Sequence, residues 1–237
     1  MVISMRKLLV SAALVLAMAV PGAGGVLAGS RAEQPHILFM GDSLLAFNGL
    51  SGKAVSDATA AALGEPVRDR AVIGAKIIHN LPLTGAMGLR ISSQFREGPW
   101  EWVVMNGGGN DMWLGCGCER CERRLSRLIS DDGARGKIPS LVGRLRATGA
   151  RVIYLGYLRS PGMGSPIENC RDEGDELEAR IAAMAARDEG VYFLSLADLV
   201  PYGDRSYHAF DMIHPSPKAS AAIGRMVAEL IQRAEAR

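Results

Sequence analysis

Three short groups of residues have the types and the spacing that nucleophilic chemistry needs. Residues 41–44 read Gly-Asp-Ser-Leu, residues 108–111 read Gly-Gly-Asn-Asp, and residues 211–215 read Asp-Met-Ile-His-Pro. A serine at the start of a helix has its hydroxyl beside unpaired backbone N–H groups. An asparagine amide can donate to an anionic oxygen, and an aspartate three residues before a histidine can hold the imidazole in one tautomer.

Each group also has an ordinary structural explanation. Ser43 is a favoured helix N-cap, the glycines before Asn110 suit a turn, and Asp211 can close a turn ahead of a helix that begins with proline. Taken alone, each of these explanations is about as strong as a chemical one. The three groups nevertheless fall in order at the ends of predicted strands, and that coincidence favours one shared site.

Short apolar runs alternate with helical patterns along the chain. Strands are predicted over 36–40, 67–72, 100–105, 151–155 and 191–196, and helices over 52–63, 119–130, 137–148, 174–188 and 217–235. This alternation predicts an α/β fold in which a parallel sheet is covered by helices on both faces. Loops at the carboxyl ends of such strands build the functional site. The two long loops are 158–173 and 201–213.

The composition agrees with one globular domain. The 237 residues are 48% hydrophobic, 22% charged and only 5% aromatic, and the formal charge is +2. These values exclude disordered, collagen-like and multi-span membrane chains, and they do not favour a nucleic-acid partner. No repeat, low-complexity tract or linker divides the chain.

Residues 1–28 have the pattern of a secretory signal peptide. Arg6 and Lys7 precede an apolar run of thirteen residues, 8–20, and small residues stand at the −3 and −1 positions of a cleavage site after Ala28. A membrane-spanning helix takes roughly 20 apolar residues. We therefore expect cleavage after Ala28 rather than an uncleaved anchor, no stable membrane insertion afterwards, and a mature domain over residues 29–237 in the periplasm or outside the cell.

Four cysteines follow the second group. Cys116, Cys118 and Cys121 lie within six residues, and Cys170 is distant from them in sequence. In a reducing compartment this spacing suits zinc, but export favours two disulfides and no metal. Each of the three possible pairings joins one member of the cluster to Cys170, and the sequence does not choose among them.

The sequence resembles the SGNH (GDSL-type) hydrolases, a family of serine esterases and lipases with a flavodoxin-like, three-layer α/β/α fold. The nucleophile block of the family matches residues 41–44, its Gly-x-Asn-Asp block matches 108–111, and its Asp-x-x-His block matches 211–214. A further block supplies an oxyanion glycine, matched by Gly74, although Ile73 stands where many members carry serine. The resemblance covers about residues 35–235, and the cysteine-rich segment 116–121 is not part of the general family pattern.

The resemblance implies a role for each matched residue. Ser43 would be the nucleophile, His214 the general base, and Asp211 the group that orients His214 and stabilises its cation. The oxyanion of the tetrahedral intermediate would be held by the N–H groups of Ser43 and Gly74 and by the side-chain amide of Asn110. The resemblance implies a fold built on a five-stranded parallel sheet. It also implies a reaction that needs no cofactor.

The expected function is that of an exported serine esterase acting through an acyl-enzyme. Short acyl esters, such as O-acetyl groups on glycans, are the favoured small-molecule or glycan substrates, because neither long loop is continuously apolar. The alternatives are a lysophospholipase or acyl thioesterase, and a non-catalytic carbohydrate-binding or envelope-assembly protein on the same fold. A zinc or redox protein built on the cysteines is a weaker alternative. The sequence does not give the oligomeric state.

Two further positions are ambiguous in the sequence. Met112 and Trp113 follow the oxyanion block and belong either to an apolar wall of the site or to the core. His208 precedes His214 by six residues, and we expect it in a solvated loop.

Overall fold

One parallel sheet organises the part of the chain that the computed structural model describes, residues 34–162 and 164–237. The strand order is β2-β1-β3-β4-β5. The strands are β1 (Ile37–Met40), β2 (Val67–Asp69), β3 (Trp102–Met105), β4 (Arg151–Leu155) and β5 (Val191–Leu194). The predicted five-stranded parallel sheet is confirmed.

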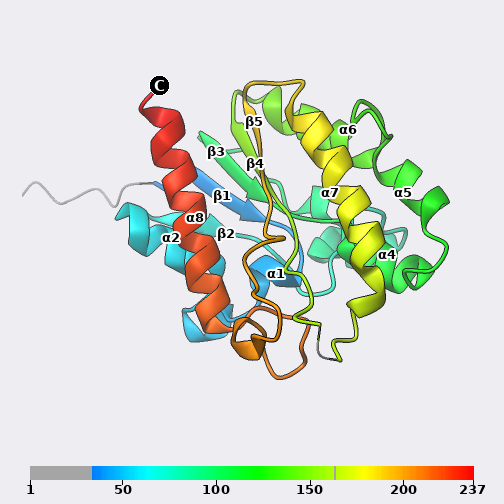
Figure 1. Ribbon diagram of the computed structural model, residues 1–237. Coiled ribbons are helices and arrows are strands. Elements are labelled where there is room, and N and C mark those ends of the chain that lie inside the picture. Colours follow the sequence, from blue (N-terminus) through cyan, green and yellow to red (C-terminus); the bar gives the residue numbers. More distant parts are fainter. Residues whose placement is uncertain (1–33, 163) are drawn as a thin grey trace, which may run out of the picture. The chain divides into compact units, whose positions relative to one another are not determined.

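Helices cover both faces of this sheet, as Figure 1 shows. One face carries α1 (Ser43–Ala46), α2 (Val55–Leu63) and α8 (Pro217–Glu235), and the other carries α4 (Gly109–Cys116), α5 (Glu122–Leu128), α6 (Lys137–Arg146) and α7 (Arg171–Ala185). Side chains alternate along β1, so that Ile37 and Phe39 enter one apolar cluster and Leu38 and Met40 the other. Because both faces are buried there, β1 and β3 are continuous apolar runs, whereas the edge strand β2 reads Val-Arg-Asp and is largely exposed. The three-layer arrangement is confirmed.

The connections contain several short helical turns. They are η1 (Gly49–Ser51), α3 (Pro82–Thr84), η2 (Gly85–Leu89), η3 (Ile91–Ser93), η4 (Glu168–Cys170) and η5 (Arg205–Tyr207). The turns between residues 82 and 93 were not predicted, since they are too short for a helical period to show.

The helix α4 is the main difference from the predicted elements. It begins at Gly109, within the glycine run that the sequence suggested was a turn. The helix α7 begins at Arg171 rather than at residue 174, and β2 ends at Asp69 rather than at residue 72. The Asp69 carboxylate accepts the N–H of Ala71 at 2.8 Å and ends the regular strand there.

The last helix, α8, begins at a well-defined cap. Ser216 Oγ accepts the N–H of Ala219 at 3.2 Å, and Pro217 occupies the first helical position. The helix packs closely on α2 at Gly224, where a Cβ atom would lie 2.5 Å from that of Ala58. This packing fixes the point at which the loop carrying Asp211 and His214 enters α8.

Asp111 fastens the loop after β2 to the first turn of α4. Its two carboxylate oxygens accept the N–H groups of Ile77 and Ile78, each at 2.8 Å. The side chain is buried, and burial raises its pKa from the ordinary 3.8 to about 6 despite these hydrogen bonds. The loop that contains Gly74 therefore depends on a buried carboxylate.

None of the helices within residues 34–162 and 164–237 is long and apolar enough to cross a membrane. The expected signal peptide, residues 1–28, lies outside the described residues.

The raised pKa of Asp111 should make the stability of the folded protein depend on pH. Because its folded-state pKa is raised, the folded protein binds the proton more tightly than the unfolded chain, and this stabilisation is lost as the pH rises from about 4 to about 6. Asp111→Asn does not titrate. The free energy of unfolding of the wild type, minus that of the variant, should therefore fall by about 3 kcal/mol between about pH 3 and about pH 7.

Urea denaturation at a series of pH values measures this difference. Asp198→Asn makes the same change at an exposed position and serves as the control. A wild-type advantage over Asp111→Asn that stays constant between about pH 4 and pH 7 would contradict the prediction.

Candidate active site

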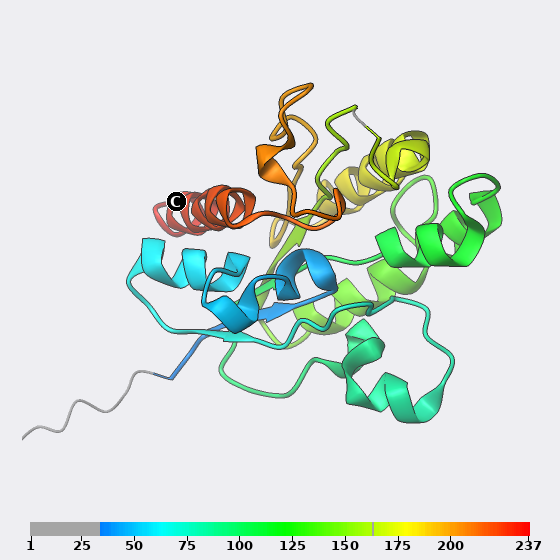
Figure 2. The ribbon, with the colours of Figure 1, turned by 90° about the horizontal axis from the view of Figure 1, so that it is seen from below.

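Ser43 stands at the first position of α1, directly after β1. The preceding turn needs glycine at residue 41, since a Cβ atom there would lie 1.9 Å from Asn106 Oδ1. Asp42 caps α1 by accepting the N–H of Leu44 at 3.0 Å. The turn thereby brings Ser43 to the wall of a pocket of about 100 Å³, which Asn110 and His214 also line. Figure 2 shows α1, in blue, between the orange loop before α8 and the green segment that contains α4.

Asp42 is buried beneath Ser43, and its carboxylate has partners on three elements. Asn106, directly after β3, donates its amide to Oδ1 at 2.7 Å and accepts the N–H of Asp42 at 3.0 Å. Burial raises the pKa of Asp42, and the hydrogen bonds from Tyr157, Asn106 and Leu44 oppose that rise. The turn that presents Ser43 is thus fixed to the neighbouring strand by the carboxylate of Asp42.

Tyr157 joins the turn that presents Ser43 to α4. Its hydroxyl donates to Asp42 Oδ2 at 2.5 Å and accepts the N–H of Gly109 at 3.0 Å. A Cβ atom at residue 109 would lie 2.7 Å from the Tyr157 ring, so glycine is needed there too. Tyr157 was not singled out from the sequence. Its signal was its position two residues beyond β4, at the edge of the sheet where the site residues lie.

Asp211 and His214 form a compact pair before α8. His214 Nδ1 lies 2.5 Å from Asp211 Oδ2, while Asp211 Oδ1 accepts the backbone N–H groups of Ile213 and His214 at 3.0 Å each. Burial alone would raise the pKa of Asp211, but these hydrogen bonds outweigh it and the pKa is lowered. Met212 adopts the left-handed region, with φ of 58°, and so lets the chain turn back between the two residues.

The segment after α1 supports the histidine. The Phe47 ring stacks on that of His214, with centroids 4.4 Å apart and planes within 4°. Asn48 donates its amide to the carbonyl of Pro215 at 3.0 Å. Phe47 and Asn48 were not singled out from the sequence, because only the fold places them beside residue 214.

Asn110 lies in the first turn of α4 and faces the loop after β2. Its amide donates to the carbonyl of Ala75 at 3.1 Å. Gly74 has a φ of +78°, in the left-handed region that glycine adopts readily, but it is not among the residues that line the pocket. The structure therefore brings Ser43, Asn110 and His214 to one pocket and places Gly74 in the adjoining loop. Within the described residues, no hydrogen bond joins Ser43 Oγ to His214.

The pocket beside Ser43 has largely apolar walls. Met112 and Trp113, whose placement the sequence left ambiguous, both line it, and Met112 also belongs to the core. Leu158 and Ile167 line the pocket from the segment between β4 and α7. An acyl group could thus be sheltered from water next to the candidate nucleophile.

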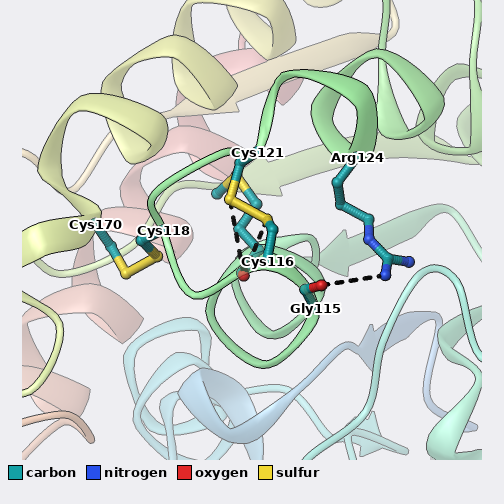
Figure 3. The surroundings of a disulfide bond; sticks show 7 residues. Gly115, Cys116, Cys118, Cys121, Arg124 and Cys170 are labelled. Atoms are coloured by element: carbon teal, nitrogen blue, oxygen red, sulfur yellow. Dashed lines mark hydrogen bonds between the residues drawn. A yellow bond between two sulfur atoms is a disulfide. The ribbon is translucent and has the colours of Figure 1, made fainter.

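Figure 3 shows two disulfides beside the end of α4. One joins Cys116 to Cys121, and the other joins Cys118 to Cys170 across 52 residues of sequence. The structure selects this pairing from the three that the sequence allowed. Cys118 and Cys170 both line the pocket, so the second disulfide forms part of its wall.

His208 differs from the sequence-based expectation. It is buried rather than solvated, with 6% of its surface exposed, because residue 208 pairs with Pro215 in a short antiparallel bridge. Neither ring nitrogen has a hydrogen-bond partner among the described residues. Burial lowers the pKa of His208, with Asp211 opposing, so the ring is neutral at pH 7.

Residues 39–222 match the model of the GDSL-like Lipase/Acylhydrolase family. No curated protein matches the sequence. Similar solved structures include a protein described as an SGNH hydrolase from Slackia heliotrinireducens, with a TM-score of 0.54, 23% identity, and coverage of 84% of this chain and 100% of the other.

Two carbohydrate esterases are also similar in structure. Est24, a carbohydrate acetylesterase from Sinorhizobium meliloti, has a TM-score of 0.54, 16% identity, and coverage of 84% and 99%. A carbohydrate esterase family 2 enzyme with a carbohydrate-binding domain, from Corynascus thermopiles, has a TM-score of 0.61, 18% identity, and coverage of 87% and 68%. At these identities the three likenesses show a shared fold.

The Tyr157 hydroxyl gives a testable prediction. Tyr157→Phe keeps the ring but leaves Asp42 Oδ2 and the N–H of Gly109 without that partner. The free energy of unfolding should fall by about 1–3 kcal/mol, measured by urea denaturation. Tyr192→Phe is the control, since this half-buried tyrosine of β5 packs against Trp102, and we expect a change below about 0.5 kcal/mol. Equal losses in the two variants would refute a special role for the Tyr157 hydroxyl.

Proposed function

The chain belongs to the GDSL-like lipase/acylhydrolase family, and from this premise we propose that it is an exported serine esterase that hydrolyses short-acyl carboxylic esters, O-acetyl groups on glycans above all. One observation carries the proposal. Ser43, Asn110 and a His214 held by Asp211 come from three separate parts of the sequence and meet at one pocket. This set supplies a nucleophile, an oxyanion donor and an oriented base.

The first half of the proposed reaction forms an acyl-enzyme. Ser43 Oγ attacks the carbonyl carbon of the ester while His214 Nε2 accepts the serine proton. The Asp211 carboxylate, bonded to Nδ1, keeps the imidazole in the tautomer that leaves Nε2 free, and its lowered pKa keeps it ionised to stabilise the imidazolium. The carbonyl oxygen becomes an oxyanion as the tetrahedral intermediate forms.

The oxyanion needs donors that are already in place. The Ser43 N–H lies in the first turn of α1, where helical N–H groups have no partner within the helix. The side-chain amide of Asn110 and the backbone N–H of Gly74 complete the proposed set of oxyanion donors. The hydrogen bond from the Asn110 amide to the carbonyl of Ala75, the residue after Gly74, couples the two. Collapse of the intermediate transfers the proton from His214 to the leaving alcohol. Water then repeats the sequence on the acyl-enzyme, with His214 as the base, and releases the acid.

Several features support short acyl groups as substrates. The pocket is small, about 100 Å³, and the disulfide between Cys118 and Cys170 is part of its wall. Arg159 and Arg171 bring charge to its lining from the segment between β4 and α7. Two structural neighbours are carbohydrate esterases by name. The apolar side chains of Met112, Trp113 and Ile167 favour the second candidate, a lysophospholipase or thioesterase that binds longer chains.

Export is part of the proposal and is supported by the cysteines. All four pair in two disulfides, which persist in oxidising compartments and are rare in the cytosol. The signal-peptide pattern of residues 1–28 points in the same direction.

Substitutions at the proposed nucleophile and oxyanion donor should have graded effects. Ser43→Ala should lower kcat on an activated acetyl ester by several orders of magnitude, roughly 10⁶. Asn110→Ala should cost less, on the order of 10²–10³, because it removes one of three donors. Ser51→Ala, at an exposed serine eight residues further on, is the control and should keep wild-type activity. Wild-type activity in folded Ser43→Ala would refute the mechanism.

Acyl-chain preference separates the two candidate functions. Nitrophenyl esters with acyl chains of increasing length, from acetyl upwards, should show the highest kcat/KM at the short end, because the pocket is small, about 100 Å³. Each further CH₂ that became buried would instead contribute about 0.8 kcal/mol to binding. A steady rise of kcat/KM towards the longest soluble chains would favour the lysophospholipase or thioesterase.

A further inference from the structure

A second recess lies between α6 and the segment from residue 77 to residue 92. Its volume is about 350 Å³, and it shares no lining residue with the pocket beside Ser43. Three of the side chains that line it are cationic at neutral pH, namely Arg90, Lys137 and Arg144. We call it the cation recess.

The three cations of the recess have no ion-pair partner within the described residues. No aspartate or glutamate is among its lining residues, and within residues 34–162 and 164–237 none of its three cations forms an ion pair. Elsewhere on the surface ion pairs are common, as at Arg146 with Asp188 and at Lys218 with Asp204. Like charges gathered around one recess repel one another, and an anion from outside would relieve that repulsion.

Arg90 is positioned by its surroundings rather than free on the surface. Its Nε donates to the carbonyl of His79 at 3.1 Å, which leaves the outer nitrogens of the guanidinium for another partner. A Cβ atom at Gly85 would lie 2.9 Å from Arg90 Nη2, so the glycine leaves room for the side chain. The cation therefore has a defined place in one wall of the recess.

The opposite wall is one face of α6. Lys137, Ser140 and Arg144 are three and four residues apart, the spacing that places side chains on the same side of a helix. Cations thus converge on the recess from two separate elements. The buried carboxylate of Asp111 accepts the N–H groups of Ile77 and Ile78 and is not among the lining residues.

From this convergence we propose that the cation recess binds a phosphate-class oxyanion, the phosphate or sulfate group of an ester. Such a group presents several acceptor oxygens in a tetrahedral arrangement, and it needs several donors. The guanidinium groups of Arg90 and Arg144 donate in a fork, Lys137 adds a point charge, and the hydroxyls of Ser92 and Ser140 add neutral donors. The site is independent of the acyl pocket and of the esterase mechanism.

Binding of inorganic phosphate to the full chain tests the proposal. Calorimetric titration should show saturable binding of phosphate that chloride at equal ionic strength does not reproduce. The double variant Lys137→Ala/Arg144→Ala should weaken the apparent Kd at least tenfold. The single variant Arg144→Gln, which keeps a polar side chain, should weaken it less.

The control removes the same charge outside the recess. Arg123 and Arg127 are exposed on α5, and Arg123→Ala/Arg127→Ala should bind phosphate as the wild type does. Both double variants should keep the wild-type melting temperature in chloride and the wild-type kcat on an acetyl ester. Phosphate binding that is weakened equally in the two double variants, or that is absent from the wild type, would overturn the proposal.

Vesicles identify the source of the oxyanion. A lipid headgroup would be assigned if the protein co-sediments with phosphatidylglycerol vesicles but not with phosphatidylcholine vesicles. This co-sedimentation should be lost in Lys137→Ala/Arg144→Ala and kept in Arg123→Ala/Arg127→Ala. Phosphate binding by a protein that does not sediment with either vesicle would assign a soluble phosphate ester. Vesicle binding that persists in Lys137→Ala/Arg144→Ala would refute the recess as the lipid site.

Discussion

The buried carboxylate of Asp42 is the interaction on which the geometry of the site depends. A carboxylate without partners in the interior is unfavourable, and here it is held by the Asn106 amide, the Tyr157 hydroxyl and the N–H of Leu44. Asn106 follows β3, Tyr157 follows β4, and Leu44 lies in α1. The Tyr157 hydroxyl extends the contact to the first residue of α4, next to Asn110. The proposed nucleophile and the proposed oxyanion donor therefore share one support, and neither can shift without breaking a buried hydrogen bond.

The loop that carries Asp211 and His214 is held by the chain that directly follows α1, the short helix that presents Ser43. Phe47 stacks on the His214 ring and Asn48 bonds to Pro215, both from the chain that leaves α1. On its other side, Ser165 donates to the carbonyl of Met212 at 2.7 Å. The loop needs these supports because it has little regular structure of its own and contains a non-glycine residue in the left-handed region. Serine and histidine, far apart in sequence, are thus placed by one local unit.

Most of the sheet could be predicted from the sequence, because strands buried on both faces appear as uninterrupted apolar runs. The bounds of α8 could be predicted because Ser216 and Pro217 mark its start. The glycines that begin α4 concealed that helix, since their spacing also suits a turn. Phe47, Asn48 and Tyr157 could not be found, because their partners lie far away in sequence. The burial of His208 was missed for the same reason, since it depends on a bridge to Pro215. The cysteine spacing allowed three pairings, and only the approach of η4 to the end of α4 selects one.

The disulfide between Cys118 and Cys170 stabilises the fold and also forms part of the wall of the pocket. The two apolar clusters already bury the sheet on both faces, so a cross-link inside them would add little order. The bond between Cys118 and Cys170 instead joins the chain just after α4 to the residue before α7, at the edge of the pocket, where few strand contacts constrain the chain. Closing a loop of this length contributes about 4 kcal/mol through the unfolded chain. The same bond prevents the two sides of the pocket from separating. A small pocket with a covalent link in its wall suits the proposed preference for short acyl groups, because this link opposes widening at that point.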